Sequence, residues 1–574
     1  MEQSRRSWLP FLGSMRTYDR DKLVGDVTAG IIVAIMLVPQ GMAYALLADL
    51  PPEAGLYAAI LPLLLYGLLG TSGALAVGPV AIVSLMTAEA LVGAPDPEKL
   101  IQAVTLAAKV GAIQLVMGLL KAGTIVNFLS HPVLSGFASA AALVIFSSQI
   151  KHLLGLDIPR TPFAHEQVIL AVQNAGAINP VTLALGLGSV AVLLFFRLGL
   201  PPLLARSGMQ SVLRTALPRL APLVVVAGAT LIVWALDLNA RAGVAIVGEV
   251  TSGLPPLTVP APARIAGLAP AALANVLVGY MESISVDKAL DAKRRQRIDP
   301  NQELIALGAA NLGASLTGAY PVAGGLGRSA VNFSAGARTG LASIITAALL
   351  TLTVLFLMPL FTYLPQAALA AIIMVAVTAL VDLETIRHTW QVNRADFAAV
   401  ALAFAAVLFV GIEEGILIGV LASILLYLWR TSRPHIAVVG RLGESEHFRN
   451  VRNFPVDTCP HVLAIRVDES LYFANAAYLE TQLLNAVAAR PAITDVVLVC
   501  SAVNYVDTSA METLETLIAE LHGAGVAFHQ AEVKVTERAL LEKAHFFQRT
   551  HIDEVFLSTH EAMVHLVCED LADG

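Results

Sequence analysis

Long apolar runs follow one another from about residue 24 to residue 430, and few ionisable side chains interrupt them. A helix needs about twenty apolar residues to cross the hydrocarbon core of a bilayer. Charged residues make up only 14% of the chain, whereas soluble domains carry about a quarter. These features exclude an ordinary soluble enzyme and predict a polytopic protein that is all-α within the membrane.

The character of the sequence changes after Arg430, where charged and apolar residues alternate as in soluble proteins. We predict a cytoplasmic N-terminal segment (1–23), a transmembrane domain (24–430), a linker (431–455) and a cytoplasmic domain (456–574). Within the last of these, strand-like and helical patterns alternate, which indicates a small α/β layer.

Charge and cysteine content narrow the possible partners. The net charge of −7 argues against a nucleic-acid partner. Cys459, Cys500 and Cys568 all lie in the soluble tail and lack metal-ligand spacing. We therefore expect no bound metal and free thiols in a reducing cytoplasm.

The distribution of basic residues orients the chain. Counting the apolar runs, with two pieces too short to span, gives fourteen segments. With the N-terminus in the cytoplasm, the loops after even-numbered segments carry basic residues, among them Lys121, 291–300, Arg338 and Arg430. Cytoplasmic loops are enriched in Lys and Arg. An even count places both termini in the cytoplasm.

Two short segments, 74–84 ("ALAVGPVAIVS") and 320–334 ("YPVAGGLGRSAVNFS"), are interrupted by Gly and Pro at corresponding places in two halves. Such pairs indicate a transporter binding site. A helix that begins within the membrane directs its free backbone N–H groups and positive dipole end at that point. Two such ends would form a cradle for an anion. The alternative is that both places are turns between complete spans.

Arg328 and Glu282 are ionisable residues inside these apolar segments. An intramembrane charge is costly and normally has a partner or a task. Arg328 suits neutralisation of an anionic substrate. Glu282, held away from water, suits the uptake and release of a proton. The alternative is a permanent ion pair between the two. Asp287 and Lys288 are expected at the interface, where long side chains reach water.

Gln40 and Tyr44 are one helical turn apart and therefore share a face. Pro39 is expected to kink the helix beside them. An amide donor and a phenol suit a partly dehydrated oxyanion. Alternatively, Gln40 forms only an interhelical hydrogen bond.

These stretches resemble the SulP anion permease family, which includes sulfate permeases of bacteria and plants and relatives such as pendrin and prestin. The resemblance is carried by "IMLVPQGMAYALLADLPPEAGLYAAILP", "LAVGPVAIVSLM", "GYMESISVDKALDAKRRQRIDPNQELIALGAANLGASLTGAYPVAGGLGRSAVNFSAGART" and the terminal tail. It implies fourteen segments in a seven-plus-seven inverted repeat, a core part that moves against a gate part, and a homodimer.

The resemblance also implies an anion site between half-helices that begin near Gly78 and Gly327. The binding positions that carry over are Gln40, Tyr44, Val80, Ala81, Gly327, Arg328 and Ser329. The acidic position that governs coupling carries over to Glu282. Many relatives have Ser at the position of Gly327, so backbone N–H groups are expected to contribute more here. Sodium-coupled relatives have Asp and Thr where this chain has Glu282 and Val286, which favours a proton.

The soluble tail resembles the STAS domain of anti-sigma-factor antagonists. Its segment 506–514 ("VDTSAMETL") matches a strand–Asp–Thr–Ser–helix turn in which Ser509 occupies the phosphorylatable position. Ser509 is thus a possible regulatory phosphosite. Alternatively, Asp507 or Thr508 only caps the following helix.

Residues and resemblance together predict a secondary active transporter rather than an enzyme. We expect proton-coupled sulfate symport by alternating access in a bacterial inner membrane, with no cofactor besides the coupling proton. The alternatives are a bicarbonate or dicarboxylate symporter or exchanger of the same family, and an anion channel or sensor.

Overall fold

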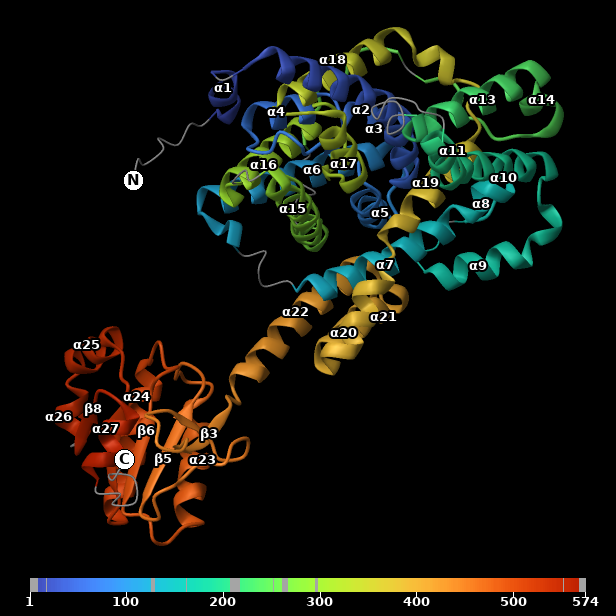
Figure 1. The fold of residues 1–574 in the computed structure, drawn as a ribbon. Helices are drawn as coiled ribbons and strands as arrows, with labels where there is room; N and C mark the ends of the chain where they lie inside the picture. Colours follow the sequence, from blue (N-terminus) through green and yellow to red (C-terminus); the bar gives the residue numbers. More distant parts are fainter. Residues whose placement is uncertain are drawn as a thin grey trace. The chain divides into compact units, whose positions relative to one another are not determined.

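The computed structural model describes all residues except 1–8, 17, 125–129, 160, 162, 207–216, 251, 261–266, 295–297, 551 and 567–574. Parts of the predicted segment 1–23, of the basic loop 291–300 and of the tail, with Cys568, therefore lie outside the described residues. The chain divides into two compact units, Met1–Ser423 and Ile424–Gly574 (Figure 1).

The first unit is helical except for two strands of two residues each. Its first half contains α1 (Pro10–Met15), α2 (Arg20–Leu47), α3 (Pro52–Tyr57), α4 (Leu61–Leu69), β1 (Val77–Gly78), α5 (Ala81–Ala90), α6 (Asp96–Leu119), α7 (His131–Ser148), α8 (Ile150–Leu154), α9 (Ala164–Gln173), α10 (Pro180–Leu194), α11 (Leu200–Arg206), α13 (Ala221–Leu236) and α14 (Leu238–Ala242). Its second half contains α15 (Ala269–Asp291), α16 (Pro300–Leu316), β2 (Ala323–Gly324), α17 (Leu326–Ala335), α18 (Leu341–Phe356), α19 (Gln366–Val377), α20 (Leu383–Val392), α21 (Arg394–Phe409) and α22 (Ile412–Thr431), which continues into the second unit.

Eight candidate membrane spans are found among the described residues: Arg20–Leu47, Pro52–Leu69, Glu98–Leu119, His131–Leu154, Pro180–Arg206, Ala269–Asp291, Gln366–Val392 and Ile412–Thr431. Six of the shorter helices, α5, α13, α16, α17, α18 and α21, have 10–17 residues and lie at the remaining predicted segments. Together they account for the fourteen predicted segments.

The same succession of elements occurs in both halves. A long helix, a helical segment, a two-residue strand and a ten-residue helix follow one another as α2, α3–α4, β1 and α5, and again as α15, α16, β2 and α17. The two strands pair antiparallel. This repetition agrees with the predicted inverted repeat, and the two interrupted segments are half-helices rather than turns between complete spans.

Packing favours two groups of helices in the first unit, which also contact each other where α2 meets α19 and α13. In one group, α16 packs on α6 and α4, and α18 packs on α2. In the other, α10 packs on α19 and α13, and α21 packs on α7. Figure 1 shows α10, α11 and α13 to the right of α4, α6, α15 and α16. The groups correspond to the predicted core and gate parts.

Glycine allows helices α6 and α16 to approach closely within the core. A Cβ on Gly111 of α6 would lie 2.7 Å from the backbone nitrogen of Leu312 in α16. A Cβ on Gly308 of α16 would likewise lie 2.7 Å from the backbone nitrogen of Leu115. Any side chain at these positions would force the helices apart.

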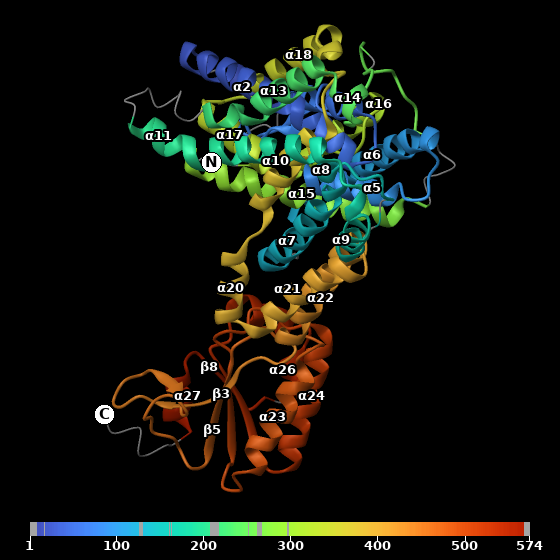
Figure 2. The same ribbon diagram turned by 90° about the vertical axis from the view of Figure 1, so that its right-hand side faces the viewer.

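The second unit is a six-stranded mixed sheet in the order β4-β3-β5-β6-β7-β8. Its strands are β3 (Ile436–Arg441), β4 (Phe448–Asn450), β5 (Val462–Val467), β6 (Asp495–Val499), β7 (Ala527–Ala531) and β8 (Glu554–Phe556), and its helices are α23 (Ala476–Ala488), α24 (Thr508–Gly523), α25 (Val535–Lys543), α26 (Phe546–Thr550) and α27 (Thr559–His565). Figure 2 shows α23 and α24 on one face and α27 on the other. Separate apolar clusters lie beneath the two faces.

Two predictions about the tail need correction. The segment 431–455 is not a linker along its whole length, because β3 and β4 within it pair with the sheet of the tail. Only the long-range pairing of β3 with β5 reveals these short strands. Cys500 is free as predicted, and it is buried. Cys459, by contrast, is in a disulfide, because the fold and not sequence spacing decides which thiols meet.

Candidate functional site

The antiparallel pairing of β1 with β2 brings the two half-helices together. Val77 lies opposite Gly324, and Gly78 lies opposite Ala323. Because α5 and α17 begin within three residues of these strands, their N-terminal ends meet in the core. Neither N-terminus is capped by a side chain. Their first backbone N–H groups therefore remain available to an anion.

Arg328 lies in the first turn of α17 and is 2% exposed. Its guanidinium donates to the carbonyl oxygen of Pro79 and, at 3.5 Å, to that of Ala76. Within the described part of the chain no ion pair joins it to Glu282, so the predicted alternative of a permanent pair is not the arrangement found. Arg328 thus crosses from one half-helix segment to the other and keeps its positive charge.

Gly327 marks free space in front of α17. It is exposed, and a Cβ added to it would meet no atom within 4 Å. Val80 and Ala81, at the start of α5, are 4% and 7% exposed. The start of α17 therefore opens onto space, whereas the first residues of α5 are buried.

Ser329 faces β1 rather than this space. Its hydroxyl oxygen accepts a hydrogen bond of 3.0 Å from the backbone N–H of Ala76, and the residue is fully buried. Asn332, one turn further, donates to the carbonyl oxygen of Ala74 at 3.0 Å. These two side chains hold α17 against the segment that precedes α5.

Gln40 and Tyr44 lie on the same face of α2, as predicted, and contact each other. The amide nitrogen of Gln40 donates to the Tyr44 hydroxyl at 3.1 Å, while its amide oxygen is buried without a partner. Tyr44 lies within electrostatic reach of Arg328 and Glu282. Helix α2 packs against both α5 and α17. An unsatisfied amide oxygen and a phenol therefore border the half-helix starts.

Glu282 occupies the middle of α15, which packs against β2, α5 and α17. Its Oε2 atom is buried and has no hydrogen-bond partner. The neighbouring Ser283 accepts from the backbone N–H of Gly324 at 2.8 Å and fixes α15 to β2. The predicted residues Gln40, Tyr44, Glu282 and Arg328 are thus brought to the place where the half-helices meet.

Asn311 is a site residue that sequence reasoning missed. Its side-chain oxygen accepts from the backbone N–H of Val322 at 2.8 Å, and its nitrogen donates to the carbonyl oxygen of the same residue at 3.1 Å. This fully buried residue holds the chain directly before β2. The sequence signal that could have revealed Asn311 is a polar residue within an otherwise apolar span.

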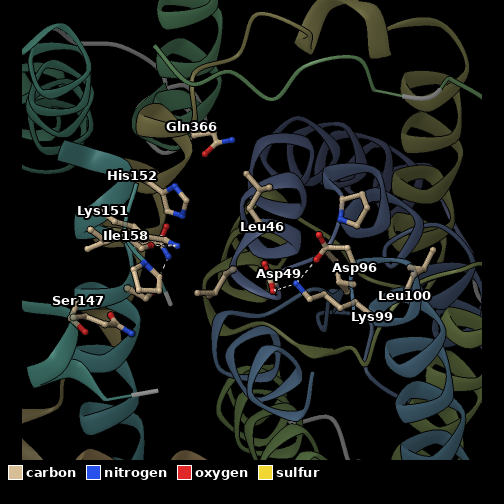
Figure 3. A pocket seen from close by; sticks show the side chains of 17 residues that line it. Leu46, Asp49, Asp96, Lys99, Leu100, Ser147, Lys151, His152, Ile158 and Gln366 are labelled. Atoms are coloured by element: carbon tan, nitrogen blue, oxygen red, sulfur yellow. Dashed lines mark hydrogen bonds and ion pairs between the residues drawn. The ribbon is translucent and has the colours of Figure 1, made fainter. Parts of the chain in front are cut away.

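A separate cavity of about 540 Å³ lies at the C-terminal end of α2. Figure 3 shows Asp49 and Lys99 on one side of it and Lys151 and His152, from α8, on the other. Lys99 forms ion pairs of 2.7 Å with Asp49 and Asp96. The lining includes none of the predicted binding residues, so this cavity is distinct from the half-helix site.

Asp287 differs from its prediction. Lys288 is exposed, but Asp287 is fully buried rather than interfacial. The reason is helical geometry: Asp287 is four residues after Ser283 and shares its inward face, whereas Lys288 points away. The sequence position near a span end did not reveal this.

Sequence profiles of known families match both units. The sulfate permease family matches residues 23–437, and the STAS domain matches residues 453–562. The chain belongs to the sulfate permease family. Membership makes it a multi-pass membrane protein and an anion transporter rather than an enzyme, with a STAS domain in its tail.

Individual relatives agree with this assignment. The chain is 38% identical to chloroplastic sulfate transporter 4.1 of Arabidopsis thaliana, over 86% of this chain and 73% of that protein. It is 33% identical to the probable sulfate transporter MT1781 of Mycobacterium tuberculosis, over 97% of each.

Solved structures share the fold. The structure of SLC26A9 matches with a TM-score of 0.89 and 24% identity, over 98% of this chain and 93% of that one. The transmembrane domain of the cyanobacterial bicarbonate transporter BicA matches with a TM-score of 0.58 and 24% identity, over 71% and 98%. The predicted fold class, a helical membrane domain followed by an α/β STAS domain, is confirmed.

Proposed function

We propose that this sulfate permease family member carries sulfate across the membrane together with a proton, by alternating access. The observation that supports it best is the meeting of two uncapped half-helices beside a buried Arg328 that forms no ion pair among the described residues. Backbone N–H groups and a guanidinium suit an oxyanion. Relatives named as sulfate transporters favour sulfate over other anions.

Within this proposal, the anion lies between Gly327 and the start of α5, with Gln40 and Tyr44 beside it. Glu282 takes up the coupling proton, because its Oε2 atom is buried without a hydrogen-bond partner and the carboxyl lies within electrostatic reach of Arg328. When protonated, Glu282 leaves the positive charge of Arg328 to the anion. When ionised, it competes with the anion for that charge.

The decisive experiment is uptake into proteoliposomes that contain the full-length protein. Sulfate, bicarbonate, chloride and fumarate are compared with and without an inward proton gradient. We expect gradient-driven accumulation of sulfate, inhibited by unlabelled sulfate more than by the other anions. Sulfate uptake that does not depend on the proton gradient would overturn the proposal of proton coupling. Preferred accumulation of bicarbonate or fumarate would overturn the assignment of sulfate as the substrate. Flux that follows membrane potential alone would indicate a channel.

A matched pair of glutamate variants tests the residue assignment. Glu282→Gln removes the titrating group and should abolish accumulation above equilibrium while leaving sulfate exchange in place. Glu384→Gln, at an exposed position in α20, should behave as the wild-type protein. Full gradient-driven accumulation by Glu282→Gln would remove Glu282 from the coupling role.

We also propose that the protein is a homodimer in a bacterial inner membrane with both termini in the cytoplasm. The basic loops support this orientation, and the resemblance supports the dimer.

Ser509 is exposed at the start of α24, while Asp507 caps that helix by accepting from the Ala510 N–H at 2.8 Å. Phosphorylation of Ser509 would thus alter the surface of the tail. Mass spectrometry of the protein purified from its native cells tests this modification.

A further inference from the structure

Three carboxyl groups are buried together where α15 ends and α16 begins. Asp287 and Asp291 lie one turn apart on α15, and Glu303 lies in the first turn of α16. Their exposed fractions are 0%, 1% and 1%. Asp287 is five residues after Glu282, so the two side chains point about 140° apart around the helix. This carboxyl cluster therefore faces the interior of the core and not the half-helix site.

Glu303 has hydrogen-bond donors on both of its oxygens. Oε2 accepts from the Tyr66 hydroxyl at 2.7 Å, and Oε1 accepts from the backbone N–H of Thr71 at 2.7 Å and from its hydroxyl at 2.5 Å. Three donors and no acceptor suit an ionised carboxylate. Glu303 is accordingly the negatively charged member of the cluster.

Asp287 and Asp291 have no such donors. All four of their carboxyl oxygens are buried without a hydrogen-bond partner. Ser72 lies beside both, and its oxygen already accepts from the N–H groups of Ala74 and Leu75 at 3.2 Å, so it has one proton to donate. Two unpaired carboxylates next to an ionised Glu303 would cost several kcal/mol each.

No nearby cation compensates Asp287. Among the described residues, the groups that act on it are Glu303 from α16, the neutral Ser72 hydroxyl and Asp291 from its own helix. Arg294 acts on Asp291, but its guanidinium donates to the Phe333 carbonyl at 3.1 Å and lies 4.0 Å from the Phe333 ring centre. The phenols of Tyr66 and Tyr280 face the cluster without supplying positive charge.

We propose that Asp287 is a second proton-binding site, separate from Glu282. One proton from the solvent converts the Asp287 carboxylate to the acid, whose O–H then points to the Glu303 carboxylate. Asp291 has the Ser72 hydroxyl beside it and lies within electrostatic reach of the positive charge of Arg294. The described residues hold no group of three His, Cys, Asp or Glu side chains arranged for a metal ion, which favours a proton over a metal.

The position of the site gives it a consequence for the core. It joins α15, α16 and the segment that contains Thr71 and Ser72, which leads directly into β1. Loss of the proton at alkaline pH would place two facing negative charges in this junction. The site therefore makes the stability of the core depend on pH without any contact with the transported anion.

The first test is thermal unfolding of the full-length protein in detergent from mildly acidic to alkaline pH. Wild-type protein should lose thermal stability as pH rises, because the bound proton is lost. Asp287→Asn stays neutral at every pH and should reduce that loss by at least half. Glu384→Gln, at an exposed position in α20, should keep the wild-type slope. Asp287→Asn should reduce the loss equally in wild-type and Glu282→Gln protein, so failure of the coupling proposal leaves this result unaffected. An unchanged slope in Asp287→Asn overturns the proposal.

Infrared spectroscopy of the folded protein supplies a second measurement that needs no stable Asp287 variant. A protonated carboxyl has a C=O stretching band distinct from that of a carboxylate. In Glu282→Gln protein at neutral pH this band should persist and should disappear on alkaline titration. Its absence there overturns the proposal. Stabilisation of wild-type protein by sodium or magnesium that exceeds the effect of lowering pH would show a cation site instead and also overturn it.

Discussion

The guanidinium of Arg328 in α17 donates a hydrogen bond to the carbonyl oxygen of Pro79, two residues before the first residue of α5. One side chain therefore connects the starts of both half-helices. Carbonyl groups accept hydrogen bonds from its two terminal nitrogens without neutralising its charge, while its Nε–H is buried without a partner. Arg328 can thus fix the geometry of the proposed site and attract the anion at the same time.

Replacement of Arg328 tests both roles. Lysine keeps the charge but presents a single ammonium group, which cannot serve the carbonyls of Pro79 and Ala76 in the same planar geometry. We expect Arg328→Lys to weaken sulfate binding at least tenfold, about 1.4 kcal/mol, and Arg328→Ala to abolish it. Equilibrium binding of radiolabelled sulfate measures this. Arg197→Lys, at an exposed position, is the control, and wild-type binding by Arg328→Ala would refute the assignment.

Ser329→Ala should lower stability through a lost internal hydrogen bond. The hydroxyl accepts from the buried N–H of Ala76 at 3.0 Å, and an unsatisfied buried donor costs about 1–3 kcal/mol. Ser334→Ala lies on the exposed side of the same helix and should leave the melting temperature unchanged. Thermal unfolding in detergent compares the two. Equal melting temperatures would contradict the described bond.

Gly327→Leu should block transport without unfolding the protein. A side chain at this position enters open space in front of α17, and leucine is a good helix former. Gly340→Ala is the steric contrast, since its Cβ would lie 1.9 Å from the Gly67 carbonyl oxygen. We expect a normal melting temperature and no uptake for the first variant, and a lowered melting temperature for the second. Normal uptake by Gly327→Leu would place the anion elsewhere.

At acidic pH, the backbone amides of the tail should lose protection against hydrogen exchange, because Asp553 becomes protonated. Burial opposes ionisation of this carboxyl, but hydrogen bonds from the Phe528 N–H and from His522, both 3.0 Å, outweigh it and lower its pKa. Because the pKa is lower in the folded state, the stabilisation is present above the pKa of the unfolded chain and is lost as pH falls through the folded value.

Hydrogen exchange at the β7 strand (Ala527–Ala531) measures this loss. After correction for intrinsic rates, exchange should accelerate on acidification of the wild-type protein. In Asp553→Asn it should already be fast at neutral pH and change little further. The same protection at both pH values in the wild-type protein would contradict the prediction.

Cys500 should resist alkylation in the folded protein. Burial, together with the nearby Glu532 and Glu537, raises the pKa of its thiol to about 12, and the thiolate is the reactive species. We expect no iodoacetamide adduct on the peptide that contains Cys500 under native conditions, and complete modification after denaturation. Mass spectrometry of the peptide measures the extent of alkylation. Modification of Cys500 in the native protein would contradict the prediction and show that the tail unfolds locally.

Much of the membrane architecture could be predicted because hydrophobicity and charge are local properties of the chain. The half-helices were visible as Gly- and Pro-interrupted runs, and Gln40 and Tyr44 shared a face by helical spacing alone. Asp287, by contrast, was placed at the interface, although it is buried. Its environment depends on Glu303, in the next helix, and on Ser72, which lies far from it in sequence.

The sequence by itself determined that the chain crosses a membrane many times, carries an α/β tail and contains two ionisable residues, Arg328 and Glu282, inside apolar segments. Only the tertiary structure decided that Arg328 bonds to carbonyl oxygens of the other half rather than to Glu282. The physical reason is that apolar length and charge act within one segment. The partner of a buried polar group is decided by the antiparallel pairing of strands almost 250 residues apart, Gly78 with Ala323.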